Sequence, residues 1–336
     1  MSPHQSPGTA SAITAVDLAK SYPGGRGKPR VHALAGLTFE AAAGEVFGLL
    51  GPNGAGKSTA VKILSTLSRA DSGSAHVAGI DVARQPEKVR AAIGFVAQKS
   101  VCDPMDTGYE NLVLAGRLQG LAGPAAKARA LELLDRFSLG SARDRLVKTY
   151  SGGMARKLDV AVGLMHRPSV LFLDEPTTGL DPEARADMWE EIEGMAAAEN
   201  MTVLLTTHYL DEADRLAAHV AILDGGRVVA SGTPEGLKRE LRGDAVILET
   251  GLDADPAAAA STMASLGYVR DVSRDGRTVR GRTDDGAAAL PHVLAALDAA
   301  GVAVASATLA RPSLDDVYLR HTGRSYSASA AEEVAA

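Results

Sequence analysis

One short segment combines glycines, a lysine and hydroxyl side chains, which together can hold a chain of phosphates. It consists of Gly51, Pro52, Asn53, Gly54, Ala55, Gly56, Lys57, Ser58 and Thr59. Glycines let backbone N–H groups approach phosphate oxygens, and a helix that starts here adds partial positive charge. Lys57 can pair with the β- and γ-phosphates, and the Ser58 hydroxyl can bind Mg²⁺. The spacing matches the nucleotide-binding pattern G-x-x-x-x-G-K-[ST], so we expect an ATP site rather than an ordinary glycine-rich turn.

A second segment places two carboxylates after a buried strand. The apolar run Val170–Leu173 is followed by Asp174 and Glu175. Ligands of open α/β sheets bind beyond the carboxyl ends of the strands. We expect Asp174 to hold Mg²⁺ and Glu175 to accept a proton from the attacking water. The alternative is a pair of acids that caps the turn before Pro176.

The elements around these residues alternate between strand and helix. Strand-like runs are expected at 13–22, 31–40, 45–50, 75–77, 93–97, 170–173, 202–206, 220–223 and 227–230. Helical periodicity is expected at 57–67, at 107–139 with a break at 120–124, and at 151–166, 182–199 and 209–216. The sequence Asp224-Gly225-Gly226 indicates a hairpin. This order predicts an α/β fold built on a largely parallel sheet.

The composition changes near residues 242–243, where we place a domain boundary. Strands at 245–249, 268–273, 278–282 and 302–309 alternate with helices at 256–266 and 287–299 in the order βαββαβ, which predicts a ferredoxin-like accessory domain. A last helix is expected at 313–320. The predicted organisation is a disordered tail at 1–12, a nucleotide-binding domain at 13–242, the accessory domain at 243–323 and a second tail at 324–336.

Charge and composition exclude several classes of protein. The net charge is −6 and no basic run is present, so nucleic acid is not an expected partner. Cys102 is the single cysteine and is expected to be a half-buried small residue in a reducing compartment. The first residues do not read as a signal peptide, and no apolar run approaches the length of a membrane span. Any link to a membrane is therefore expected to run through another protein.

Further motifs follow one another in a fixed order. They are Tyr22 at the end of the first strand, Gln98 after strand 93–97, the sequence Tyr150-Ser151-Gly152-Gly153-Met154, the sequence Gly179-Leu180-Asp181-Pro182, and His208 after strand 202–206. Together with the phosphate loop they resemble the ATP-binding-cassette (ABC) ATPases, a P-loop fold with a mixed sheet core and a helical signature subdomain. The match covers about residues 13–242. Tyr150 and Met154 depart from the Leu and Gln usual at the edges of the signature.

The resemblance implies a role for each motif. Tyr22 would stack on adenine, Gln98 would contact Mg²⁺ or the lytic water, and His208 would contact the γ-phosphate and orient the base. Each has a plainer alternative: a strand-end core tyrosine, a solvent-facing amide and a structural histidine.

In this family the signature of one subunit closes over ATP held by the other. Ser151, Gly152 and Gly153 would thus bind the nucleotide of a second copy. Asp181 would lie at that interface, or simply cap the helix that follows. Since the chain has one phosphate loop and one signature, a two-fold homodimer is expected.

The resemblance also indicates a branch of the family. The segments 150–154, 206–214 and 311–318 resemble the daunorubicin/doxorubicin-resistance type of exporter subunit. This implies a peripheral ATPase at the cytoplasmic face of the cell membrane, paired with a multi-span permease for drug, antibiotic or lipid efflux. A non-transport ABC ATPase acting on DNA or the ribosome is the alternative. The short segment between Thr59 and Thr149 and the single cassette disfavour it.

Overall fold

The computed structural model describes residues 11–24, 29–241, 243–323 and 326. The chain forms two compact units, Met1–Ser231 and Gly232–Ala336. The boundary differs from the predicted 242/243 because a helix, α8 (Pro234–Glu240), belongs to the second unit, where it packs against α11 (Leu314–Thr322). No strong apolar period marks residues 234–240, so neither this helix nor its unit could be predicted.

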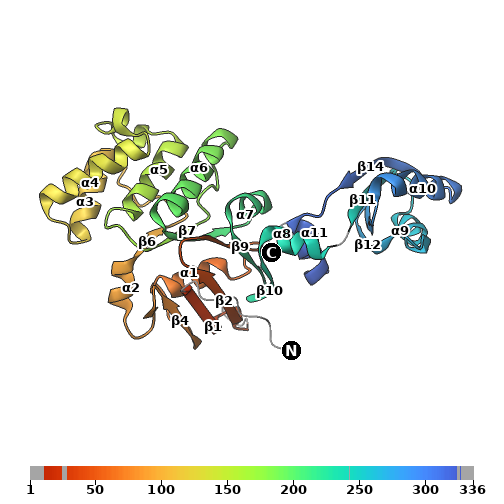
Figure 1. Cartoon of the computed structure of the whole chain (residues 1–336), viewed down its shortest axis with the longest axis horizontal. Helices are drawn as coiled ribbons and strands as arrows, with labels where there is room; N and C mark the ends of the chain where they lie inside the picture. The colour runs from red at the N-terminus through yellow and green to blue at the C-terminus, as the bar shows by residue number, and fades with distance from the viewer. Residues whose placement is uncertain (1–10, 25–28, 242, 324–325, 327–336) are drawn as a thin grey trace. The chain divides into compact units, whose positions relative to one another are not determined.

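A six-stranded sheet forms the centre of the first unit (Figure 1). Its order is β10 (Arg227–Gly232), β9 (His219–Asp224), β3 (Val46–Leu50), β8 (Thr202–Thr207), β7 (Val170–Asp174) and β6 (Ile93–Val96). Strand β3 pairs in parallel with β8 and β9, and β7 pairs in parallel with β6 and β8. The carboxyl ends of β3, β7 and β8 therefore lie at one edge, as the predicted fold requires.

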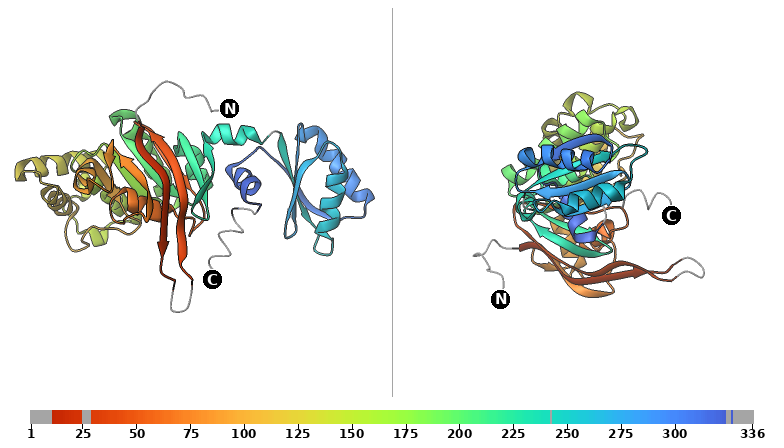
Figure 2. Two further views of the ribbon diagram at one scale, coloured as in Figure 1. Left: turned by 90° about the horizontal axis from the view of Figure 1, so that it is seen from below. Right: turned by 90° about the vertical axis from the view of Figure 1, so that its right-hand side faces the viewer.

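A second, antiparallel sheet is built on two long strands that run side by side (Figure 2). Its order is β2 (Val31–Ala42), β1 (Ser11–Tyr22), β4 (Ser72–Val77) and β5 (Ile80–Asp81). Residues 11 and 12 belong to β1, so the predicted tail of residues 1–12 is too long at this end. Residues 1–10 lie outside the described part of the chain.

Helices flank the central sheet and form a helical subdomain (Figure 1). They are α1 (Lys57–Leu64), α2 (Pro86–Ala92), α3 (Gly108–Leu118), α4 (Gly123–Arg136), α5 (Gly152–Gly163), α6 (Pro182–Glu199) and α7 (Leu210–Leu216). The expected break near 120–124 separates α3 from α4. Strand β5 and helix α2 were missed because each is short and lacks an apolar period.

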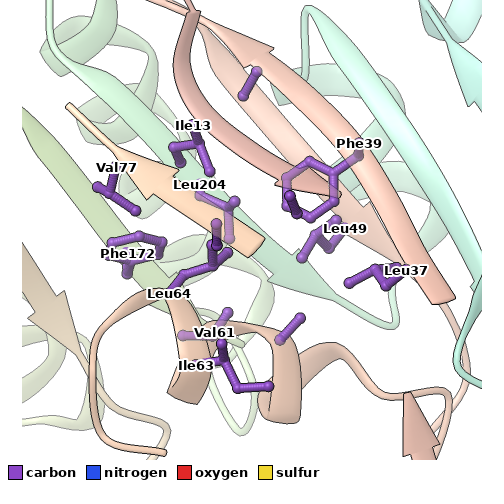
Figure 3. Packing of buried hydrophobic residues seen from close by; sticks show 14 of the residues in the cluster. Ile13, Leu37, Phe39, Leu49, Val61, Ile63, Leu64, Val77, Phe172 and Leu204 are labelled. Carbon is purple, nitrogen blue, oxygen red and sulfur yellow. The ribbon is translucent and has the colours of Figure 1, made fainter. Parts of the chain in front are cut away.

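The hydrophobic core lies between the two sheets and α1 (Figure 3). Phe172 and Leu204 of the central sheet, Leu64 of α1, and Ile13 and Leu37 of the antiparallel sheet are all at most 1% exposed. Burial of such side chains stabilises the fold by about 1.5–3 kcal/mol each. This packing fixes α1, and with it the phosphate loop, against the ends of β7 and β8.

The second unit contains an antiparallel sheet with the order β12 (Arg270–Asp275), β13 (Thr278–Thr283), β11 (Asp244–Thr250) and β14 (Val304–Ala310). Helices α9 (Pro256–Ser265) and α10 (Gly286–Ala299) share one apolar core with it. The strand order and the chain order βαββαβ agree with the predicted ferredoxin-like motif.

The end of the chain differs from the predicted tail at one described residue. Tyr326 is buried, its ring lies 5.0 Å from that of Tyr318, and its N–H donates to Asp315. Burial of an aromatic ring can stabilise the fold by more free energy than the ordering of the chain costs. The Ser/Ala-rich composition of the predicted tail did not indicate this contact.

Candidate active site

The phosphate loop connects β3 to α1 and depends on two close backbone approaches. Gly56 has φ +105°, and a Cβ there would lie 2.5 Å from the carbonyl oxygen of Ala33. A Cβ at Gly51 would lie 2.6 Å from the carbonyl oxygen of Leu223. Gly56 caps α1 without any side-chain hydrogen bond, so the first N–H groups of the helix are not covered by a capping side chain. Such a helix start binds anions.

Lys57 is held at the centre of this loop. It is 4% exposed, and its Nζ donates to the carbonyl oxygens of Gly51 (2.7 Å) and Pro52 (3.0 Å). The same Nζ lies 3.5 Å from Glu175 Oε1. A buried ammonium is stable only when it is compensated, and these contacts supply that compensation.

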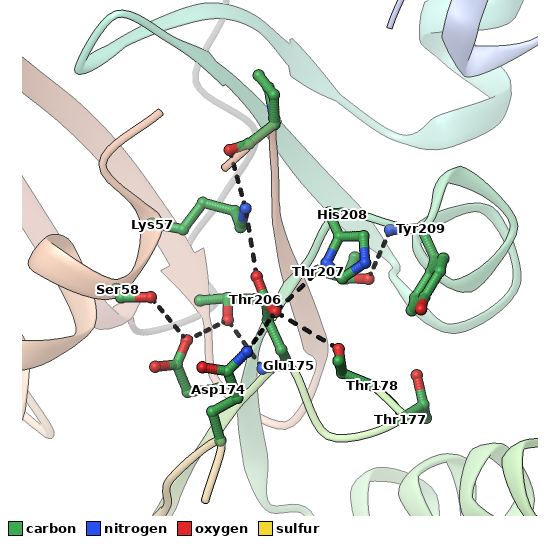
Figure 4. Close-up of polar contacts among 12 residues, drawn as sticks. Lys57, Ser58, Asp174, Glu175, Thr177, Thr178, Thr206, Thr207, His208 and Tyr209 are labelled. Carbon is green, nitrogen blue, oxygen red and sulfur yellow. Dashed lines mark hydrogen bonds and ion pairs between the residues drawn. The ribbon is translucent and has the colours of Figure 1, made fainter. Parts of the chain in front are cut away.

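Asp174 lies at the end of β7, where it faces the loop (Figure 4). Its Oδ1 accepts hydrogen bonds from the hydroxyls of Ser58 (3.3 Å) and Thr206 (2.6 Å). The Thr206 hydroxyl also accepts a bond from the backbone N–H of Glu175 (3.1 Å). Thr206 therefore fixes both acidic residues, a role that sequence reasoning missed although the Thr206-Thr207-His208 run marked the place.

Glu175 is the point at which the predicted side chains meet. Its Oε2 lies 3.1 Å from Gln98 Nε2 and 3.3 Å from His208 Nδ1, and accepts a bond from Thr178 (3.4 Å) (Figure 4). Glu175 has φ +48°, a left-handed conformation that is uncommon for a residue with a side chain. Strained backbone of this kind concentrates at functional sites.

The charge of Glu175 is set by opposing effects. Burial raises the pKa of its carboxyl, but contact with His208 and the positive charge of Lys57 outweigh burial and bring the pKa below its ordinary value. The group is therefore ionised at neutral pH. An ionised, buried carboxylate can accept a proton from water, which is the requirement for a general base.

The remaining predicted residues lie apart from this group. Ser151 is exposed and caps α5, where it accepts from the N–H of Met154 (3.2 Å). Asp181 caps α6 by accepting from the N–H of Ala184 (2.9 Å). Within the described ranges, no hydrogen bond or ion pair joins either residue to Glu175.

Tyr22 lies at the end of β1 opposite Val31 of β2. Two residues further along β2, Ala33 contacts the phosphate loop at Gly56, as described above. The tyrosine ring is 37% exposed, and Lys20 Nζ lies 5.6 Å from its centre. Tyr22 is thus partly exposed at the end of β1, whose neighbour β2 approaches the phosphate loop.

Comparison with known proteins agrees with this geometry. The family described as ABC transporter matches residues 34–178, and the family described as ATP-binding protein DrrA1-3-like, C-terminal domain, matches residues 232–322. The daunorubicin/doxorubicin resistance ATP-binding protein DrrA of Streptomyces peucetius is 45% identical, over 96% of this chain and 96% of its own length. This chain belongs to the ABC transporter family of ATP-binding subunits.

Other relatives place the cassette in the same group. The linearmycin resistance ATP-binding protein LnrL of Bacillus subtilis is 34% identical, over 93% of this chain and 98% of its own length. Nod factor export ATP-binding protein I of Burkholderia thailandensis is 40% identical, over 86% of this chain and 91% of its own length.

Solved structures share the fold of the cassette. An ATP-binding subunit of an ABC transporter has a TM-score of 0.58 at 30% identity, covering 68% of this chain and 92% of its own. A dimeric ATP-binding cassette in a post-hydrolysis state, bound to ADP and Pi, has a TM-score of 0.60 at 24% identity, covering 66% and 98%. The cassette is therefore an ATPase of this fold, and the prediction of an ABC ATPase with a DrrA-type C-terminal domain is confirmed.

The signature helix of the cassette is tied to the active site by a buried arginine that sequence reasoning missed. Arg156 donates to the carbonyl oxygens of Ala97 (2.6 Å), Asp174 (3.3 Å) and Pro176 (2.7 Å). One turn along the helix, Asp159 lies 3.8 Å from Arg156 and accepts from Ser100, Val101 and Cys102. The residues that flank Gln98 are thus held by α5.

A second contact that sequence reasoning missed connects α7, the helix after His208, to α6. Glu212 of α7 is fully buried, and its Oε1 accepts from the Thr177 hydroxyl (2.7 Å) and from Trp189 Nε1 (3.0 Å). Thr177 lies between Glu175 and the segment 179–182, so its bond to Glu212 holds the turn after Glu175 against α7.

The unusual Tyr150 of the signature has a structural reason in this cassette. Its hydroxyl donates to the carbonyl oxygen of Ala142 (2.8 Å), and a Cβ at Gly108 would lie 2.4 Å from the same hydroxyl. The tyrosine therefore anchors the signature loop to neighbouring segments by a hydrogen bond that a leucine cannot make.

Proposed function

We propose that this chain is the ATP-hydrolysing subunit of an exporter, that two copies close over two ATP molecules, and that the pair drives a separate multi-span permease. The observation that carries the proposal is the convergence of Lys57, Asp174 and Glu175 at the carboxyl edge of the central sheet. The ionised state of Glu175 supports its assignment as the base that activates water. Gln98 and His208, which touch the same carboxylate, are assigned to its orientation.

Magnesium suits the donor set next to the loop. Ser58 and Asp174 offer hard oxygen ligands, and the amide oxygen of Gln98 is a candidate for a third. Among the described residues no cluster of three or more His, Cys, Asp or Glu side chains is suited to a metal. This agrees with a Mg²⁺ ion that protein oxygens share with phosphate oxygens. When bound, the ion would neutralise phosphate charge.

The proposal of two copies is supported by the placement of the two motifs on different elements. The phosphate loop begins α1, whereas Ser151, Gly152 and Gly153 begin α5, next to Leu180 and Ala184 of the same chain. An isologous pairing would bring the signature of each copy over the ATP of the other. Asp181, beside the signature, would then lie in the interface, and Tyr22 would stack on adenine.

The permease contact is assigned to an apolar surface that follows Gln98. Val101, Met105, Leu114 and Leu118 are between 51% and 79% exposed. Because the backbone before and after Gln98 is held by Arg156 and Asp159, displacement of this surface would reach the active site. No helix among the described residues has both the length and the apolar character of a membrane span. We assign the subunit to the cytoplasmic face of the cell membrane, as a peripheral protein.

The exported compound is proposed from the names of the relatives. They are named for daunorubicin/doxorubicin resistance, linearmycin resistance and Nod factor export. We therefore propose efflux of a drug, antibiotic or lipid.

Purification of the tagged chain from solubilised membranes of its host tests the proposal. A multi-span membrane protein should co-purify, and the complex in vesicles should move daunorubicin only with ATP and Mg²⁺. The Glu175→Gln complex is the matched control and should assemble without transport. If no membrane protein co-purifies while ATP hydrolysis is normal, the transport role is wrong and the ATPase assignment stands.

A further inference from the structure

A cavity of about 440 Å³ lies in the first unit, away from the residues assigned to ATP. It is enclosed by the end of α1, the β4–β5 hairpin and the segment that leads into α2. Leu18, Ile63 and Val82 form an apolar floor and are each at most 7% exposed. Cavities of this size, with an apolar floor and a few polar groups at the rim, are typical of small-molecule sites.

The charged groups of this cavity are mainly cationic. Arg69, Arg84 and Arg90 line it, together with one acidic residue, Asp81. Asp81 already accepts from the backbone N–H groups of Ala83 and Arg84, both at 2.9 Å, and its other oxygen lies 3.7 Å from Arg84 Nε. Since the one acid is engaged in its own turn, the lining has an excess of positive charge that an anion would offset.

One arginine of the cavity is held in place by strained backbone. Arg90 donates to the hydroxyl of Thr66 (3.1 Å), and Thr66 has φ +66°. A left-handed conformation is a genuine outlier for a β-branched residue, and such strain points to a functional constraint. Here it places a hydroxyl at the rim of the cavity, where it orients the guanidinium of Arg90.

We propose that this cavity binds an organic anion that carries a phosphate or carboxylate group on an apolar body. Guanidinium groups bind both kinds of anion through paired N–H donors. The acidic group would lie between Arg69 and Arg90, and the apolar body would cover the floor. The same chemistry is present in a soluble phosphate ester and in the head group of an anionic lipid.

The location connects such a ligand to the ATP site. Ile63 lies in the last turn of the helix that begins with Lys57 and Ser58, and Thr66 follows two residues after that helix ends. Arg90 lies on α2, which continues directly into β6 and then to Gln98. A bound anion would contact both elements, so its occupancy should change the ATP concentration that gives half-maximal hydrolysis.

Titration calorimetry of the full chain with hexyl phosphate, with ADP filling the nucleotide site, tests the binding. Hexyl phosphate should bind, and the double variant Arg69→Gln/Arg90→Gln should weaken it at least about tenfold, because charge-assisted hydrogen bonds are lost. Lys88→Gln, on α2 but outside the lining, is the matched control and should bind normally. Ser74→Trp, at the exposed rim, should block the cavity with all arginines retained.

Two further arms distinguish the source of the anion and its effect. If the chain binds phosphatidylglycerol vesicles but not phosphatidylcholine vesicles, and the double variant loses this binding, the site is assigned to a lipid head group. If the chain binds hexyl phosphate but neither kind of vesicle, the site is assigned to a soluble ester. Equal binding by native chain and double variant, or no binding of either probe, overturns the proposal. Binding without any change in half-maximal ATP concentration overturns only the regulatory part.

Discussion

The two units of this chain use the same ionic chemistry for different ends. In the cassette, Lys57, His208 and Gln98 all lie within 3.5 Å of one carboxylate, Glu175. In the C-terminal unit, charges form a small network between strand β13 and helix α11: Arg280 lies 2.8 Å from Asp315 and 3.9 Å from Asp316, and Arg282 lies 3.0 Å from Asp316. The contacts of Glu175 lie beside the phosphate loop and set up chemistry, whereas the network of the C-terminal unit holds a helix on a sheet.

Replacement of the shared carboxylate tests this distinction with the largest expected effect. Glu175→Gln should lower ATP turnover by about 10²–10⁴-fold, the usual contribution of a general base, while ATP still binds. Phosphate release and fluorescent-nucleotide binding measure the two properties. Glu193→Gln, on the exposed side of α6, should leave both unchanged. Normal ATP turnover in Glu175→Gln would show that Glu175 is not the general base.

Replacement of a paired arginine should affect stability and not chemistry. Arg282→Ala removes the nearer of the two arginines that face the buried Asp316 and leaves it with Arg280 at 3.9 Å and the bonds from Ser313, which should cost about 1–3 kcal/mol. Trypsin cleavage of the C-terminal unit should begin at lower urea concentration, with ATP affinity unaltered. Arg274→Ala, at an exposed position of β12, is the control. If Arg282→Ala abolished ATP binding instead, the separation of roles between the units would fail.

The pH dependence of hydrolysis sharpens the account of Glu175. Contact with His208 is the foremost of the effects that lower the pKa of this carboxyl. In the native chain the ionised base is therefore retained as the pH falls, until the lowered pKa is reached. His208→Ala should raise the pKa, so the acid limb of single-turnover hydrolysis should move to higher pH. An unmoved acid limb would show that another group titrates there.

The smallest expected effect concerns the reactivity of Cys102, which tests the contacts that Asp159 makes with residues 100–102. Burial, followed by the negative charge of Asp159, raises the pKa of the thiol to about 12. Because only the thiolate reacts, iodoacetamide labelling at neutral pH should be at least about a hundredfold slower than in the urea-unfolded chain. Asp159→Asn should make the native thiol react faster. Equal rates before and after unfolding would contradict the buried contact.

Motif spacing and strand order were sufficient to predict the centre of the site. Lys57, Asp174, Glu175 and His208 each follow a strand or begin a helix, so the parallel topology alone brings them to one edge. Arg156, Asp159 and Glu212 could not be predicted, since their partners are backbone carbonyls and side chains far along the chain. The position of α8 was likewise missed, because its partner α11 lies about eighty residues later in the sequence.

The central claim, that each copy supplies the signature for the ATP of the other, is tested most directly by mixing two inactive variants. Lys57→Ala lacks a working phosphate loop, and Ser151→Arg lacks a working signature. In a two-fold pair of unlike copies one complete site re-forms, so an equimolar mixture should recover about a quarter of native hydrolysis. A mixture that hydrolyses no more ATP than its separate components would contradict the shared site.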